Sequence, residues 1–177
     1  EIYVKGSLNL FAGETNIEVN KRIVNFNIKE LTGDLKTATL LYICDLIFQK
    51  MDKNRKMRKY TWIYIEEIST YLVNEYVVEY FLNFCKICHP YGGIPTIISQ
   101  NVEELLKNQQ IEMKLKDTYL LCLLKQGING IELLKNILGI SQVQIDFVRD
   151  NKIGTGLILI EGNKLIKFKT EVKGENK

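Results

Sequence analysis

The sequence has little or nothing of several features that mark common protein classes. Its 177 residues include one histidine, one tryptophan and two prolines. No apolar run approaches the ~18 residues that a membrane-spanning helix needs, and no signal peptide precedes the cysteines. There is no internal repeat and no low-complexity segment. We therefore expect one globular domain, residues 1–177, without a membrane span. Because the chain begins at Glu1 rather than at a methionine, we expect a fragment or a processed product.

Neither sign of charge dominates the composition. The chain has 24 Lys and Arg against 21 Asp and Glu, a net charge of +3. Such a weak balance neither demands nor excludes a nucleic-acid partner. One local exception is the basic run "KMDKNRKMRKY" at Lys50–Tyr60. We interpret it as a solvated linker, with a phosphate-binding patch as the alternative.

The four cysteines lie inside apolar segments, which predicts reduced, buried thiols rather than a disulfide framework. They are Cys44, Cys85, Cys88 and Cys122. The stretch "CKICH" matches the Cys-x-x-Cys-His pattern that attaches c-type haem. However, Cys85 and Cys88 extend the apolar stripe of a predicted helix over Val73–Cys88, which is a sufficient reason for them. A zinc site would need two further ligands at short spacing. We expect neither haem nor zinc there.

Alternation of apolar strands with helical segments predicts an α/β fold with a largely parallel sheet flanked by helices. Continuous apolar runs are typical of central parallel strands buried on both faces. Three such runs are predicted to be adjacent strands: Ile63–Ile65, Ile94–Ile98 and Leu120–Leu124.

Terminal strands and further helices complete the expected fold. We expect N-terminal strands within residues 1–32, including "RIVNFNI" at Arg22–Ile28, and then a helix from about Gly33 to Met51. Two short helices, "GIELLKNIL" and "SQVQIDFVRD", follow the third apolar run, and Ser141 is the expected N-cap of the second. A C-terminal hairpin over residues 154–172 turns at Gly162–Asn163.

Polar residues follow each of the three predicted parallel strands. They are Glu66–Glu67, Ser99–Gln100–Asn101 and Lys125–Gln126. In α/β folds, ligands bind at the carboxyl ends of the strands. A hydrophobic strand ending in two acids resembles a Walker B motif, in which the first acid holds Mg²⁺ through water and the second positions the attacking water. This interpretation makes Glu66 the magnesium residue, Glu67 catalytic and Gln100 a γ-phosphate sensor. Simpler roles stay open for these residues, because buried strands often end in acids where the chain re-enters solvent and a residue such as Gln100 often starts a helix.

The order of the motifs carries a family resemblance. The most specific piece is "YGGIPTIISQNVEELLKN", and "LGISQVQ" followed by the "GTGL" hairpin is a second. From about Ser7 to Val172 the chain resembles the C-terminal ATPase region of the VirB4 family, the ATPases of type IV secretion and conjugation found on Gram-positive conjugative elements such as conjugative transposons. The resemblance implies a RecA-like P-loop fold and hydrolysis of Mg-ATP.

The sequence departs from that family at positions that matter for catalysis. No G-x-x-x-x-G-K-[ST] occurs, so the phosphate cradle and its lysine are absent and the chain corresponds to the distal half of a RecA-like domain. Glu66 stands where the family usually has Asp, and His89–Pro90 replaces an Arg-Lys pair. We therefore expect that the isolated chain is not competent as an ATPase and that no cofactor binds to it alone.

The resemblance also implies partners and a location. These are other secretion subunits, a homo-oligomer of the full-length protein and a peripheral position at the cytoplasmic face of the membrane; DNA is left open as a partner. Two other interpretations compete with the enzyme: a degenerate, non-catalytic assembly or partner-binding module, and an unrelated α/β binding domain. The coding sequence upstream of Glu1 discriminates between the enzyme and the module, because an intact P-loop there favours the enzyme.

Overall fold

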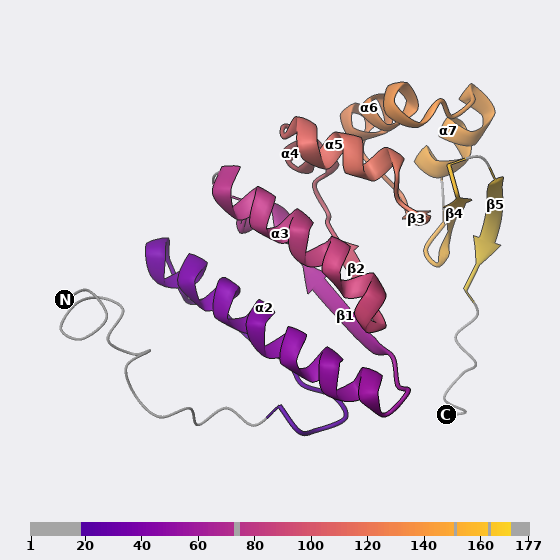
Figure 1. The fold of residues 1–177 in the computed structure, drawn as a ribbon. Coiled ribbons are helices and arrows are strands. Elements are labelled where there is room, and N and C mark those ends of the chain that lie inside the picture. The colour runs from indigo at the N-terminus through magenta and orange to yellow at the C-terminus, as the bar shows by residue number, and fades with distance from the viewer. Residues whose placement is uncertain (1–18, 73–74, 151, 163, 171–177) are drawn as a thin grey trace, which may run out of the picture. The chain divides into compact units, whose positions relative to one another are not determined.

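The computed structural model describes residues 19–72, 75–150, 152–162 and 164–170. The chain divides into two compact units, one ending at Ile98 and the other beginning at Ser99. Each unit contains its own sheet (Figure 1). No helix among the described residues is both long enough and apolar enough to cross a lipid bilayer.

The first unit is a strand–helix–strand unit preceded by a long helix. Its elements are α2 (Gly33–Lys56), β1 (Thr61–Glu66), the 3-10 turn η2 (Ile68–Thr70), α3 (Glu75–Cys88), the 3-10 turn η3 (His89–Tyr91) and β2 (Gly93–Ile98). Strands β1 and β2 are parallel, and their register runs from Thr61 opposite Gly93 to Glu66 opposite Ile98. Parallel neighbours require a long crossover, which α3 supplies.

Helices α2 and α3 cover one face of the β1–β2 sheet. Their contact with the sheet is close at Gly93, where a Cβ would collide with Sδ of Met51 in α2 and would lie 3.1 Å from Cβ of Cys88 in α3. On the same face Ile63 is 5% exposed. The predicted burial of β1 on both faces is wrong, because the alternate residues Trp62 and Tyr64 point to the other face and are exposed.

The predicted linker at Lys50–Tyr60 is also wrong, because α2 continues to Lys56. Asp52 pairs with Lys56 and Arg55 one turn later, and cations are favoured at a helix C-terminus. The predicted strand at Arg22–Ile28 is absent, and the structure has no strand between Val19 and Thr32. Its apolar residues do not alternate strictly, and Ile23 is exposed. The rest of the predicted N-terminal strands lies outside the described residues.

The second unit packs helices against an antiparallel sheet. Its elements are α4 (Val102–Leu105), α5 (Gln109–Lys116), β3 (Leu120–Leu123), α6 (Ile128–Leu138), α7 (Gln142–Arg149), β4 (Thr155–Ile160) and β5 (Lys164–Lys169). The strand order is β3-β4-β5. Strands β4 and β5 occupy the span of the expected C-terminal hairpin. The core combines residues of β3, α6, α7 and β4: Leu123, Ile131, Leu134, Ile145, Val148 and Leu157.

The predicted place of Leu120–Leu124 in a parallel sheet is wrong. Leu120 to Leu123 pair antiparallel with β4, in a sheet separate from that of β1 and β2. The expectation of a largely parallel sheet is corrected accordingly: the described residues form one parallel pair and one antiparallel three-stranded sheet. An unbroken apolar run indicates burial, but it does not specify the partner or the direction of pairing.

Candidate functional site

Glu66 and Glu67 lie together at the carboxyl end of β1. Glu66 is the last residue of the strand, stands opposite Ile98 and has an exposed side chain. The backbone N–H of Glu67 donates to the carbonyl of Ile98 at 2.9 Å, which extends the ladder by one bond. The carbonyl of Glu67 accepts from the N–H and the hydroxyl of Thr70, at 3.0 and 2.9 Å. Both backbone polar groups of Glu67 are therefore held by hydrogen bonds.

The backbone of Glu67 is in the left-handed region, with φ 49° and ψ 43°. This conformation is uncommon for residues other than glycine, and such strain concentrates at functional sites. The left-handed backbone of Glu67 turns the chain sharply after β1. The carboxylates of Glu66 and Glu67 therefore both lie at the end of the strand. No pattern in the sequence predicts this feature, since glutamate does not favour the left-handed region.

The two carboxylates at the end of β1 are residues that could hold a magnesium ion. Mg²⁺ prefers oxygen ligands and is usually held by one or two carboxylates together with substrate phosphates and water. Among the described residues, no three or more His, Cys, Asp or Glu side chains are grouped so that they could hold a metal ion by themselves. Glu66 and Glu67 could supply the one or two carboxylates of such a site.

Gln100 belongs to the second unit and is described there. It has an exposed side chain and lies between Ser99 and the N-cap of α4. Asn101 is that N-cap, and its side-chain oxygen accepts from the N–H of Glu104 at 3.2 Å. The sensor role of Gln100 stays a prediction. Lys125–Gln126 follow β3, so the expectation that they end a strand of the β1–β2 sheet is wrong.

The cysteines of "CKICH" belong to the inner side of α3. Cys88 is fully buried and Cys85 is half-buried, while His89 is exposed and starts η3. Burial raises the pKa of the Cys88 thiol to about 11. In α2, burial and then the nearby Cys88 raise the pKa of Cys44 to about 12. Thiolates are the reactive and metal-binding form, so these thiols are poorly suited to either task.

Comparison with solved structures finds a match over almost the whole chain. VirB4 of Thermoanaerobacter pseudethanolicus aligns with a TM-score of 0.76 at 20% identity, over 96% of this chain and 47% of that one. The chain has a VirB4-like fold. It spans about half the length of that VirB4. No protein family matches the sequence in a family scan, and no curated protein matches it either. The VirB4-like fold agrees with the resemblance that the sequence motifs carry.

Proposed function

We propose that this chain is part of a VirB4-like ATPase that powers type IV secretion and conjugative transfer, and that it carries the metal-binding side of a RecA-like ATP site. One observation carries the proposal. Within a VirB4-like fold, Glu66 ends the parallel strand β1 and Glu67 follows it, held in a left-handed conformation with its backbone N–H and carbonyl hydrogen-bonded. Parallel strand ends are where nucleotides bind in α/β folds.

Each acidic residue has a distinct role in this proposal. Glu66 would hold Mg²⁺ through water, and the ion would supply positive charge to offset that of the phosphates. Glu67 accepts a hydrogen bond from the attacking water and orients it toward the γ-phosphate.

The chain supplies acceptors for the metal but no cradle for the phosphates. In P-loop ATPases the loop amides and a lysine make most of the phosphate contacts, and the sequence has no such loop. The proposed site therefore needs a P-loop from outside these 177 residues. In the complete protein we place the ATPase at the cytoplasmic face of the membrane, in a homo-oligomer that contacts other secretion subunits.

The test uses a polypeptide that joins this chain to the coding sequence preceding Glu1. We expect Glu67→Gln to lower kcat for ATP hydrolysis by about 100-fold or more, the usual contribution of a positioned base, while Mg-ATP binding persists. Glu103→Gln, at an exposed acid in the first turn of α4, is the matched control and should leave kcat unchanged. Hydrolysis by Glu67→Gln at the normal rate would refute the catalytic role.

A second candidate function is a non-catalytic assembly module with the same fold. Two departures from the VirB4 family favour this module. Glu66 stands where the family usually has Asp, and His89–Pro90 stands where it has an Arg-Lys pair. One extra methylene displaces a carboxylate by roughly 1 Å, which the octahedral shell of magnesium tolerates poorly. Absence of hydrolysis from the joined polypeptide despite an intact P-loop would favour this module.

A further inference from the structure

Contacts on both sides of Glu67 determine where its carboxylate lies. The N–H of Glu67 is fixed to Ile98 of β2, and the N–H and the hydroxyl of Thr70 donate to the Glu67 carbonyl. Ile68, the first residue of η2, is fully buried and anchors the turn in the core. The bonds from Thr70 therefore set the conformation of the backbone that carries the Glu67 side chain.

A cation of α2 contacts the residue that ends the same turn. The N–H of Tyr71 donates to the carbonyl of Ile68 at 2.9 Å, which closes η2. Nζ of Lys36 lies 4.6 Å from the centroid of the Tyr71 ring, and both side chains are half-buried. A lysine ammonium is attracted to the face of an aromatic ring, and the attraction grows as water is excluded. Lys36 therefore ties the end of η2 to α2.

Helix stability does not explain the position of Lys36. This residue lies in the first turn of α2, where the positive end of the helix dipole disfavours cations. Its ammonium makes no ion pair with any residue that the structure describes. Helix α2 runs into β1 through the short turn 57–60, so the beginning of the helix returns to the end of the strand (Figure 1). The partner that the structure gives this cation is the Tyr71 ring.

We propose that Lys36, Thr70 and Tyr71 are positioning residues for ATP hydrolysis. They fix η2, and η2 fixes the direction of the Glu67 carboxylate. A general base must lie within hydrogen-bond reach of the water that it orients, and a small misplacement lowers the rate strongly. Each of the three residues acts through the backbone of Glu67, so none needs to contact the nucleotide. The proposal rests on the role proposed above for Glu67.

Hydrogen exchange on the 177-residue chain measures the turn without any nucleotide. Thr70→Val removes the side-chain bond to the Glu67 carbonyl, so the amides of Glu67 and Tyr71 should exchange about 5-fold faster. Lys36→Met keeps most of the side chain but removes its charge, and should speed exchange of the same amides about 3-fold. Thr70→Ser keeps the hydroxyl and should exchange as the parent chain does. Nuclear magnetic resonance gives the rate of each amide.

The second unit offers a matched contact for each substitution. Thr155 repeats the arrangement of Thr70, because its N–H and its hydroxyl donate to the carbonyl of Lys152 at 3.0 and 2.7 Å. Nζ of Lys167 lies 4.4 Å from the centroid of the Phe147 ring. Thr155→Val and Lys167→Met therefore remove the same kinds of contact from a turn and a ring that do not hold Glu67. Both should leave hydrogen exchange in η2 unchanged.

Steady-state kinetics of the joined polypeptide separate positioning from folding. We expect Thr70→Val to lower kcat about 10-fold and Lys36→Met about 3-fold, while KM for Mg-ATP stays within about 2-fold of the parent value. Thr70→Ser should restore kcat, and the controls Thr155→Val and Lys167→Met should keep it. In the Glu67→Gln background Thr70→Val should have no further effect on kcat, because no base is left to direct.

Three results would overturn this proposal while leaving the proposed function intact, provided that Glu67→Gln lowers kcat. They are unchanged exchange in Thr70→Val, equal kcat in Thr70→Val and Thr155→Val, and a further loss of kcat when Thr70→Val is added to Glu67→Gln. Normal hydrolysis by Glu67→Gln, or no hydrolysis by the joined polypeptide, would instead refute the proposed function and this proposal with it. Far-UV circular dichroism checks that each variant is folded.

Discussion

Glu67 combines a strained backbone with a proposed catalytic side chain. Glycine adopts the left-handed conformation of Glu67 at no steric cost, whereas for other residues this conformation costs about 1–2 kcal/mol. We therefore expect Glu67→Gly to raise the free energy of unfolding of the first unit by about 1 kcal/mol while removing hydrolysis by the complete enzyme. Denaturant unfolding followed by Trp62 fluorescence measures the stability.

Glu66→Gly is the matched control for this prediction. Glu66 ends β1 in extended backbone, where glycine costs about 0.5–1 kcal/mol. The two neighbouring substitutions should therefore shift the unfolding midpoint in opposite directions. If both destabilise the first unit equally, Glu67 is not strained.

Cys44 makes stability depend on alkaline pH. Its thiol has a pKa of about 12 in the folded chain, against an ordinary value of 9.0. Below pH 9 both states keep the proton, so the contribution to stability is intact. As the pH rises from 9 toward 12, the unfolded thiol ionises first and stability falls, by about 1.4 kcal/mol per thiol at pH 10.

The Cys44→Ala variant isolates this effect. We expect the free energy of unfolding to drop between pH 8 and pH 10 by about 1.4 kcal/mol less in Cys44→Ala than in the parent chain. Urea titrations at the two pH values give the difference. An equal drop in both proteins would show that Cys44 ionises as easily in the folded chain as in the unfolded one.

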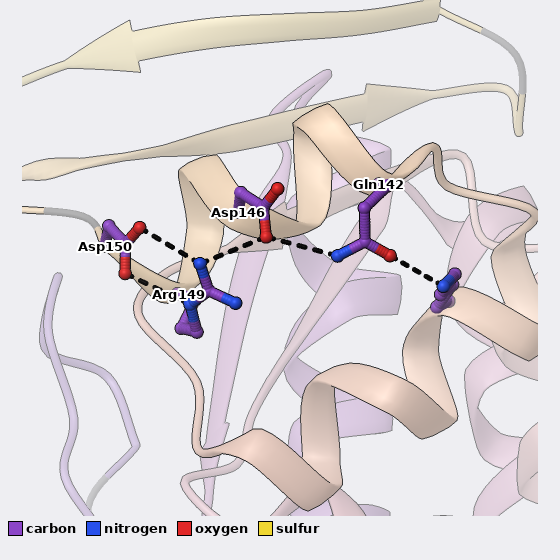
Figure 2. A network of polar contacts seen from close by, with 5 residues as sticks. Gln142, Asp146, Arg149 and Asp150 are labelled. Atoms are coloured by element: carbon purple, nitrogen blue, oxygen red, sulfur yellow. Dashed lines mark hydrogen bonds and ion pairs between the residues drawn. The ribbon is translucent and has the colours of Figure 1, made fainter.

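At the scale of elements, α7 shows which polar contacts matter. At its start, Oε1 of Gln144 accepts from both the N–H and the hydroxyl of Ser141, at 2.9 and 2.8 Å. Along its exposed side, Gln142, Asp146, Arg149 and Asp150 form a chain of hydrogen bonds and ion pairs (Figure 2). A hydrogen bond from Arg149 lowers the pKa of Asp150. Exposed contacts of this kind contribute little, whereas capping satisfies backbone groups that a helix leaves unpaired.

Gln144→Ala tests this ranking. Loss of a cap costs about 1 kcal/mol, so amide hydrogens of α7 should exchange roughly 5-fold faster. Gln142→Ala removes only surface bonds, to Lys135 and Asp146, and should leave exchange nearly unchanged. Hydrogen exchange read by mass spectrometry on a peptide covering α7 gives both rates. Faster exchange in Gln142→Ala than in Gln144→Ala would reverse the ranking.

Local patterns in the sequence predicted the elements better than their pairing. The apolar stripe of α3 and the Ser141 cap of α7 were predictable because a helix repeats within a few residues. The pairing of β3 with β4 was not predictable, because the same apolar run is compatible with either a parallel or an antiparallel neighbour. The short helix α5 was missed because it buries only Ile111. At the site, the acid pair was visible in the sequence, but the backbone strain at Glu67 depends on Ile98 and Thr70.

At the scale of the whole molecule, the chain has a VirB4-like fold that corresponds to about half the length of that protein. The first of its two compact units carries Glu66 and Glu67. The proposed ATP site also needs a P-loop that the sequence does not contain. The central claim is that this chain supplies the metal side of the ATP site and not the phosphate cradle.

Calorimetric titration with Mg-ATP tests that claim most directly, on the 177-residue chain and on a polypeptide that joins it to the coding sequence preceding Glu1. Two carboxylates repel an anion unless magnesium mediates, so the chain alone should bind with a Kd of about 1 mM or weaker. The joined polypeptide should bind in the micromolar range, and Glu66→Ala should weaken that binding about 10-fold or more. Micromolar binding by the chain alone that disappears in Glu66→Ala would contradict the account, because the acidic side would then be a sufficient nucleotide site.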